Sequence, residues 1–297
     1  MLTTAPIDVY RHSKDIDFLR DQFLTRPVKL EFINPRHELK PYISKMWLFE
    51  NNSGLANHGT LIAPNAKPKI IIPYKNALTT TDNGKTTICK ESDICFIGIR
   101  DVPVTLGTPK GATGSIGIEL TTDGAYKFLN VPMYELTNNL FSFSELYGTE
   151  GKELLQRMMN DEDPKQKINI IQGFLIEQLK AGEKNNSIVN YSVNFISSLH
   201  GLASIKQLEK KTGYSKRYLD LLFKNHLGIS PKTYSTIIRF QHFYKILGDD
   251  GTSEIIKMQS ALELYYDQSH FIKEFKRYTG YSPKQYSKLN NDFGKYF

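Results

Sequence analysis

DQSHFIKEFKRYTGYSPKQY, residues 267–286, repeats a pattern that the chain has already used 52 residues earlier, in SKRYLDLLFKNHLGISPKTY, residues 215–234. The two copies share a phenylalanine, a glycine, a Ser-Pro pair and a tyrosine at equal spacing: Phe223 and Phe275, Gly228 and Gly280, Ser230–Pro231 and Ser282–Pro283, Tyr234 and Tyr286. A repeat of this size predicts one small helical unit that is built twice.

The first copy, with the residues before it, predicts a helix-turn-helix. Ser204 and Ser215 are candidate N-caps of two short helices, because a serine hydroxyl accepts a free N–H of the first turn. Gly213 lies in the turn between them, where a left-handed backbone costs glycine little. The apolar residues that we expect to point inward are Ile205, Leu208, Leu219, Leu222 and Phe223.

The inward face of the second helix determines which side chains are exposed. Lys216, Arg217, Asp220 and Lys224 then lie on its outer side, near the helix N-terminus that reaches base edges when such a helix enters the major groove of DNA. In both copies glycine ends the helix, and a Ser-Pro pair starts the next one. The helix from residue 231 to 247 is the expected rigid spacer, so that two recognition helices can enter successive major grooves about 34 Å apart.

The net charge is confined to the same region. Residues 188–297 contain 16 Lys and Arg against 9 Asp and Glu, which equals the +7 of the whole chain. A basic C-terminal third is typical of a domain that binds a polyanion, although a basic face can also be only a solvated surface.

The N-terminal part predicts a β-barrel or sandwich. Short runs rich in Ile, Tyr, Phe and Trp, such as PYISKMWLFE and SDICFIGIR, are separated by turn clusters such as TDNGK. Near Asp123 the period becomes helical, and Asp163 is a candidate N-cap of a helix that starts at Pro164. Its stripe of Ile168, Ile171, Leu175 and Leu179 packs either on its own domain or in a dimer seam. Residues 180–187 are polar and mark a linker, so the fold class is α+β.

Residues 188–290 resemble the DNA-binding domain of AraC/XylS-type transcription regulators, through GYSKRYLDLLFK, GISPKTY, DQSHFIKEFK and TGYSPKQY. The resemblance implies base contacts by Lys216, Arg217 and Asp220 in the first unit. In the second unit it implies contacts by Gln268, Ser269, His270 and Lys273, while Lys224, Lys276 and Arg277 suit phosphates. The chain departs from the family pattern at Glu209, where a small residue is usual, and at Leu264, which stands where the second turn glycine belongs.

Residues 1–160 resemble, more faintly, the cupin-like N-terminal domain of a poorly characterised subgroup of these regulators. The resemblance implies a domain that senses a small-molecule effector or mediates dimerisation. We therefore expect three parts: a regulatory domain at 1–160, a helix and linker at 161–187, and a tandem helix-turn-helix domain at 188–297. Trp47, Tyr74 and Phe96 are candidates to line an effector pocket, but packing of a barrel core explains them more economically.

The sequence offers little support for an enzyme, a metal-binding protein or a membrane protein. The seven histidines are scattered, without an HxH or HxxxH pair, so we expect no metal, no cofactor and no enzymatic activity. An alkyl-transfer repair protein would need a reactive cysteine, and we expect Cys89 and Cys95 to be ordinary free thiols. No apolar run is long enough to cross a membrane and no secretory signal is evident, which predicts a cytoplasmic protein.

The sequence thus predicts a sequence-specific, DNA-binding transcription regulator, an activator by family tendency. Its expected partners are double-stranded DNA, RNA polymerase, a second copy of the chain as a homodimer, and a small-molecule effector. Two alternatives stay open: control of the front domain by a partner protein, and the alkyl-transfer class.

Overall fold

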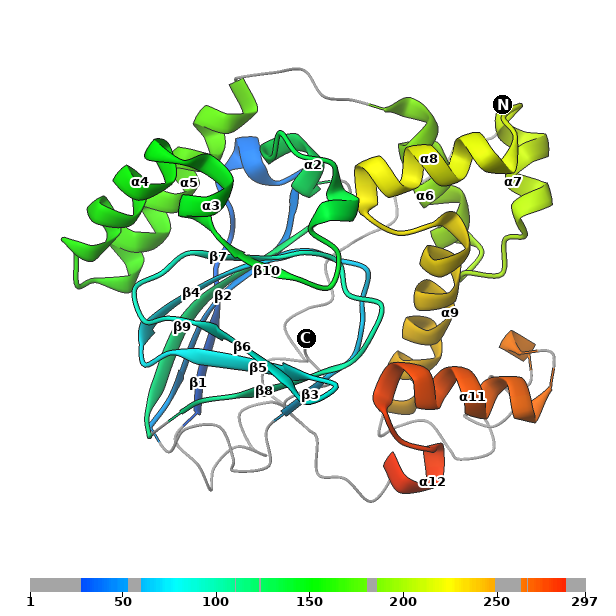
Figure 1. Cartoon of the computed structure of the whole chain (residues 1–297), viewed down its shortest axis with the longest axis horizontal. Coiled ribbons are helices and arrows are strands. Elements are labelled where there is room, and N and C mark those ends of the chain that lie inside the picture. The colour runs from blue at the N-terminus through cyan, green and yellow to red at the C-terminus, as the bar shows by residue number, and fades with distance from the viewer. Residues whose placement is uncertain are drawn as a thin grey trace, which may run out of the picture.

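A computed structural model describes residues 28–52, 60–109, 111–122, 124–180, 186–248, 263–265 and 267–286 of the chain. A β-rich part with flanking helices lies beside a helical part in which the long helix α9 stands between two shorter helices (Figure 1). The expected α+β fold class, with a β domain followed by helices, is confirmed.

The β-rich part consists of two antiparallel sheets. The six-stranded sheet has the order β1 (Val28–Phe32), β2 (Ile43–Asn51), β9 (Thr113–Leu120), β4 (Lys69–Lys75), β7 (Cys95–Ile97) and β10 (Leu140–Ser142). The four-stranded sheet has the order β3 (Thr60–Ile62), β8 (Val104–Gly107), β5 (Leu78–Asp82) and β6 (Lys85–Cys89).

Two local features explain how these strands pair. The Asn83-Gly84 dipeptide joins β5 to β6, and both residues have the positive φ of a two-residue hairpin turn. In the six-stranded sheet Gly117 of β9 lies opposite Trp47 of β2, and a Cβ atom at residue 117 would lie 2.0 Å from the indole ring. Glycine is therefore required where the tryptophan crosses the neighbouring strand.

Helices of the N-terminal half pack against the six-stranded sheet. They are η1 (His37–Leu39), α2 (Gly124–Phe128), η2 (Met133–Glu135), α3 (Phe143–Tyr147), α4 (Thr149–Met159) and α5 (Pro164–Lys180). Helix α5 begins as the sequence predicts, since the Asp163 carboxylate accepts the Lys165 N–H at 2.9 Å.

The structure corrects the assignment of the α5 stripe to a dimer seam. Ile168, Ile171 and Leu175 are at most 4% exposed, and Leu179 is packed against the same core as the six-stranded sheet. Because this core already covers the stripe within one chain, its residues are not available to a second copy. The alternative left open by the sequence, packing on the helix's own domain, is the one observed.

The expectation of two free thiols is wrong as well. Cys89, the last residue of β6, and Cys95, the first residue of β7, form a disulfide. The short connection between the two strands brings their Cα atoms to 6.0 Å, a separation that suits a disulfide. A spacing of six residues in the sequence did not reveal that the two strands meet in this way.

The C-terminal helices are α6 (Ser187–Ser198), α7 (Ile205–Thr212), α8 (Lys216–Leu227), α9 (Pro231–Gly248), α11 (Gln268–Thr279) and α12 (Pro283–Tyr286). They share a second core, which includes Phe223, Ile237, Phe240 and Phe275 and also three residues of the β-rich part, Ala63, Ala66 and Ile99. Among the described helices, none is long and apolar enough to span a bilayer.

Candidate nucleic-acid interface

The first helix-turn-helix unit forms where the sequence predicts it. The Ser204 hydroxyl accepts the Gln207 N–H, and the Gln207 side chain accepts the Ser204 N–H, so the start of α7 is capped in both directions. Gly213 ends α7 with a left-handed backbone at φ +76°, and Ser215 caps α8 by accepting the Tyr218 N–H. The turn is therefore specified by residues that satisfy free backbone groups on both sides.

Glu209, one of the two departures from the family pattern, has a structural role in this turn. Its carboxylate reaches from α7 to the start of α8 and accepts the Lys216 N–H at 2.7 Å. This N–H belongs to the first turn of α8, where four amides lack intrahelical partners and a negative charge is favourable. Glu209 therefore ties the recognition helix to the helix before it, which the sequence alone did not show.

The outer face of α8 carries the predicted contact residues. Lys216, Arg217 and Lys224 are exposed and Asp220 is half-buried, while Leu219, Leu222 and Phe223 are buried on the opposite face. Sequence reasoning missed two large side chains on the exposed face: Tyr218 is 40% exposed and Leu221 is 54% exposed. Apolar side chains at such positions suit contact with thymine methyl groups. Both residues could have been noticed in the sequence, because they are large and lie outside the stripe of inward-facing positions.

The recognition helix of the second unit, α11, has the same construction. Asp267 caps it by accepting the His270 N–H at 2.7 Å, and Gly280 ends it at φ +77°. The exposed residues of α11 include all the predicted contacts: Gln268, Ser269, His270, Lys273, Lys276 and Arg277. Leu264, at the place of the missing turn glycine, is buried, and residues 249–262 before it lie outside the described part of the chain.

Helix α9 holds the two recognition helices in fixed positions. Near its start the Tyr234 ring packs against Phe223 of α8, and further along Phe240 packs against Phe275 and Tyr278 of α11. The Arg239 guanidinium forms a largely buried ion pair with Glu274 of α11, with Nη2 and Oε2 2.5 Å apart. The spacer predicted from the sequence is therefore packed against both units.

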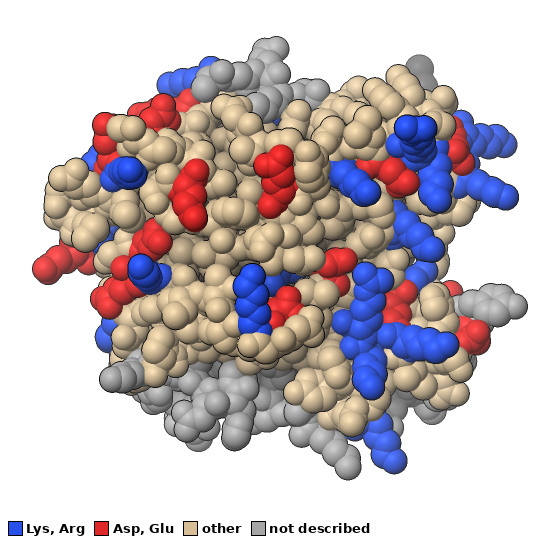
Figure 2. Space-filling model, in the orientation of Figure 1, with Lys and Arg blue, Asp and Glu red and all other residues tan. Residues whose placement is uncertain are grey.

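The two recognition helices point the same way. In Figure 1 the N-terminal ends of α8 and α11 both lie on the side of the helical part that faces away from the β sheets. Figure 2 shows Lys and Arg side chains gathered over α7 and α8 and again over α11. The predicted contact residues thus lie on two helices that run in the same direction, and all of them except the half-buried Asp220 are exposed.

Arg277 differs from the other predicted contacts because it faces the β-rich part. Its guanidinium lies 3.3 Å from the Asp101 carboxylate, and its side chain is about half exposed. A second bridge joins α9 to the β-rich part, where the Gln241 side chain donates to the Pro64 carbonyl at 2.6 Å. In the first unit, the Thr137 hydroxyl donates to the Gly228 carbonyl at 2.9 Å. The front domain therefore contacts both units and the helix between them.

A cavity of about 100 Å³ lies between the two sheets of the front domain. Trp47 and Leu78 line it, whereas Phe96 is buried in the main core and Tyr74 donates its hydroxyl to Glu50 at 3.0 Å. Of the three aromatic residues proposed for an effector pocket, only Trp47 lines this cavity.

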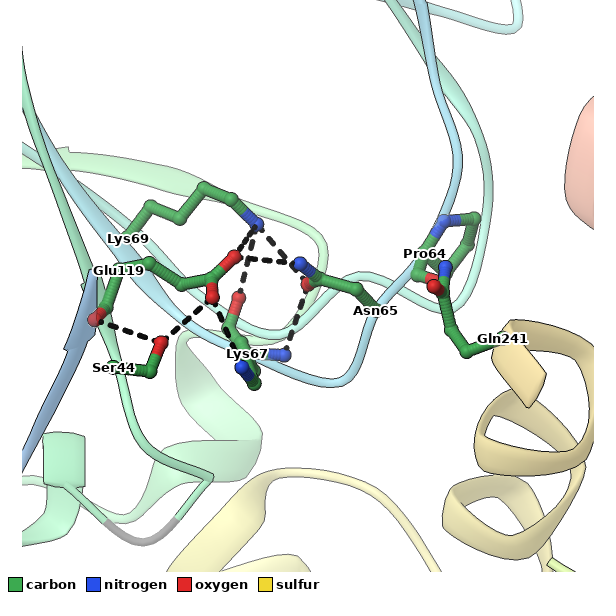
Figure 3. A network of polar contacts seen from close by, with 7 residues as sticks. All are labelled: Ser44, Pro64, Asn65, Lys67, Lys69, Glu119 and Gln241. Atoms are coloured by element: carbon green, nitrogen blue, oxygen red, sulfur yellow. Dashed lines mark hydrogen bonds and ion pairs between the residues drawn. The ribbon is translucent and has the colours of Figure 1, made fainter. Parts of the chain in front are cut away.

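A polar cluster around Glu119 borders the cavity (Figure 3). The buried carboxylate accepts from Ser44 at 2.6 Å, Asn65 at 2.8 Å and Lys67 at 3.0 Å, and Lys69 lies 3.6 Å away. Burial alone would raise the pKa of Glu119, but the charges of Lys69 and Lys67 and the Ser44 hydrogen bond outweigh it and lower the pKa to about 2. Burial also lowers the pKa of Lys69, against the opposing attraction of Glu119.

Known families match two separate parts of the chain. Residues 208–289 match a family described as a helix-turn-helix domain, and residues 31–142 match a domain family of unknown function, DUF6597. The first match covers both recognition helices and α9, and the second covers most of the two sheets.

Two curated regulators are similar to one third of the chain. The F1 operon positive regulatory protein of Yersinia pestis is 31% identical over 102 residues, which are 34% of this chain and 32% of the relative. The lactose operon transcription activator of Staphylococcus xylosus is 30% identical over 102 residues, 34% of this chain and 36% of the relative. The matched region thus spans about a third of the length of each of these relatives.

Among solved structures, ToxT from Vibrio cholerae is similar over 80% of this chain and 97% of its own, at 12% identity and a TM-score of 0.47.

Proposed function

We propose that this chain, whose C-terminal third carries a helix-turn-helix domain of the AraC family, is a sequence-specific DNA-binding regulator of transcription. The observation that carries the proposal is the common direction of α8 and α11 on α9, together with the exposed polar and basic residues that both helices carry. Two such helices on one frame suit successive major grooves of a single duplex. The relatives of this region are positive regulators, which supports an activator that contacts RNA polymerase.

The residue roles follow from position on the two helices. Near the start of α8, Arg217 has the chemistry to read guanine, and near the start of α11, Gln268 has the chemistry to read adenine. The remaining base contacts are proposed for Lys216, Asp220, Ser269, His270 and Lys273. Lys224, Lys276 and Arg277 lie further along their helices and suit phosphates.

In this proposal residues 1–160 regulate and residues 188–297 read DNA. The helix in 161–187 belongs structurally to the front core, so the proposed homodimer must use a surface other than the α5 stripe. The alkyl-transfer alternative is disfavoured, because both cysteines of the chain are buried and joined to each other. Control by a partner protein instead of a small molecule remains the second candidate for the front domain.

Footprinting on a selected operator tests the reading function. We expect protection over about two major-groove turns per chain, weakened at one end by Arg217→Ala and at the other by Gln268→Ala, at about 1–3 kcal/mol for each lost base contact. Lys224→Ala should weaken all sequences alike and flatten the salt dependence. Arg157→Ala and Gln166→Ala, exposed on α4 and α5, are the matched controls. Loss of affinity at both ends from Arg217→Ala alone would contradict separate reading by the two helices.

A further inference from the structure

The cavity between the two sheets has mostly apolar walls. Its apolar lining comes from both sheets and includes Trp47, Phe49, Ile71, Leu78, Val104 and Leu106. A space of about 100 Å³ is smaller than the apolar cavity of roughly 150 Å³ that holds benzene, so it limits the enclosed part of a ligand to at most one ring or a short branched chain. The size and the walls therefore favour a small, mainly hydrophobic ligand.

Two polar atoms at this cavity lack hydrogen-bond partners among the described residues: the Thr80 hydroxyl and the Arg100 Nε. Thr80 is 7% exposed, and the Arg100 side chain is 11% exposed. Asp82 and Thr80 are two residues apart in β5, so their side chains lie in one row on the same face of the strand. The Asp82 carboxylate is 3.7 Å from the Arg100 Nη1, which places the guanidinium along this row. Buried donors without acceptors are unfavourable, and a ligand oxygen would satisfy both.

The charges around the cavity favour an anionic oxygen. Three cationic side chains, Lys67, Lys69 and Arg100, line the cavity, whereas two carboxylates, Glu119 and Asp82, lie against them. Glu119 is engaged by both lysines and Asp82 by Arg100, so the three cations exceed the two carboxylates by one charge and the surroundings of the cavity are net positive. A neutral oxygen would satisfy the two donors, but a carboxylate oxygen also accepts a charge-assisted hydrogen bond from the Arg100 guanidinium, which is the stronger kind.

We propose that this cavity binds a compact, mostly apolar carboxylate, whose oxygens accept hydrogen bonds from Arg100 Nε and the Thr80 hydroxyl. The apolar body lies against Trp47, Phe49 and Leu78, and the carboxylate points toward the β5 row. This site gives the regulatory role of the front domain a chemical class of effector.

Two segments of the cavity wall also contact the helical part, which gives the bound ligand a route to the recognition helices. Pro64 lines the cavity, and its carbonyl accepts from Gln241 of α9, as Figure 3 shows. Arg100 lines the cavity between two neighbours that contact the helices: Ile99 lies in the helical core and Asp101 pairs with Arg277 of α11. A ligand that repositions either segment shifts α9 or α11, so this half of the proposal rests on the proposed function.

Titration calorimetry on the full chain tests the site. The probes are benzoate and 3-methylbutyrate, each paired with its alcohol, benzyl alcohol or 3-methylbutanol. We expect each carboxylate to bind at least about tenfold more tightly than its alcohol. Arg100→Met should remove this preference, and Arg157→Met, on the outside of α4, should keep it. Carboxylates that bind no better than the alcohols would overturn the proposal.

Further variants keep the test decisive if Arg100→Met does not fold. Arg100→Lys keeps the charge but lacks Nε, and Thr80→Val keeps the shape but lacks the hydroxyl. Each should weaken benzoate at least a few-fold while leaving benzyl alcohol unchanged. Equal benzoate affinity in both variants and the wild type would remove these two side chains from the site.

DNA affinity measured with and without saturating benzoate separates the two halves of the proposal. A change in operator affinity that is absent in Arg100→Met supports the route through the shared segments. Benzoate binding with unchanged operator affinity would overturn that route and keep the site. If the chain binds benzoate but binds no DNA sequence specifically, the proposed function is overturned and the carboxylate site still stands.

Discussion

Glu209 stands in α7 where a small residue is usual in the family, and its carboxylate accepts the Lys216 N–H at the start of α8. We expect Glu209→Ala to lower the free energy of unfolding by about 1 kcal/mol, the usual contribution of a capping side chain. Specific DNA binding should weaken more than non-specific binding, because α8 loses a tie that sets its angle to α7. Chemical unfolding and binding to operator and random DNA measure the two effects.

Glu209→Gln is the informative companion, because an amide oxygen can still accept the Lys216 N–H. It should recover most of the specific binding lost in Glu209→Ala, and Glu153→Ala, exposed on α4 of the front domain, should behave like the wild type. Wild-type stability and specificity in Glu209→Ala would show that the Ser215 cap alone fixes the turn.

Glu119 makes the stability of the front domain depend on acidity. Its pKa falls from a usual value of 4.5 to about 2 in the folded chain, so its ionised form stabilises the fold. That contribution, on the order of 3 kcal/mol, is fully present above about pH 4.5 and is lost as the pH falls through about 2. Thermal unfolding across this range should show the loss.

Glu119→Gln should lower stability at pH 7 by roughly 3–5 kcal/mol, because it leaves Lys67 and Lys69 without their carboxylate. The difference from the wild type should shrink between pH 4.5 and 2, while Glu153→Gln, exposed on α4, should run parallel to the wild type throughout. A constant difference over that range would mean that Glu119 does not titrate as described.

Among the helices, α5 most needs a direct test of whether its apolar stripe packs in the front core or in a dimer seam. Leu175 is fully buried in the front core, so Leu175→Asp should destabilise the fold by several kcal/mol through a buried charge. Sedimentation and thermal unfolding, with exposed Glu177→Ala as control, measure mass and stability together. Dissociation into monomers that keep the wild-type melting temperature would return the stripe to a dimer seam.

The helical elements were more predictable from sequence than the contacts between elements. Ser204, Gly213 and Ser215 act on neighbouring backbone groups, so local chemistry was enough to place α7, the turn and α8. The Cys89–Cys95 disulfide depends on how β6 and β7 approach each other. The burial of Leu175 likewise depends on which sheet α5 meets, and no local pattern encodes that choice.

The predicted DNA-contact residues show the same limit: sequence places a residue on an element but does not identify its distant partners. Arg217 and Gln268 could be placed on exposed helix faces from periodicity and a family resemblance. The partner of Arg277 could not, because Asp101 is 176 residues away and belongs to the other part of the chain. The cavity donors Thr80 and Arg100 were missed for the same reason: their shared surroundings arise only when the two sheets face each other.

For the whole molecule, the front domain and the helices are packed closely against each other. Gly228 shows how close they are: it ends α8 at φ +87°, and a Cβ atom there would lie 2.2 Å from the Thr137 hydroxyl. The Tyr126 ring also lies 4.0 Å from the His226 ring of α8. The front domain is thus packed against the end of the first recognition helix as well as paired with the second.

The Arg277–Asp101 pair gives the last prediction. Arg277 is engaged by the front domain and is also a proposed phosphate contact, so the carboxylate competes with DNA for the same guanidinium. Asp101→Asn removes the competing charge, and its side-chain oxygen can still accept from Asn138. Because partly exposed ion pairs contribute little, stability should fall by less than about 1 kcal/mol.

Operator affinity of Asp101→Asn should rise, and the slope of log affinity against log salt should steepen by about 0.9, the change for one added phosphate contact. Binding measured over a series of salt concentrations gives that slope. Glu153→Gln, which removes a distant exposed charge, should leave it unchanged. The combined variant Asp101→Asn with Arg277→Ala should lose the added slope, because the gained contact belongs to Arg277. An unchanged slope in Asp101→Asn would confine Arg277 to holding the front domain against α11.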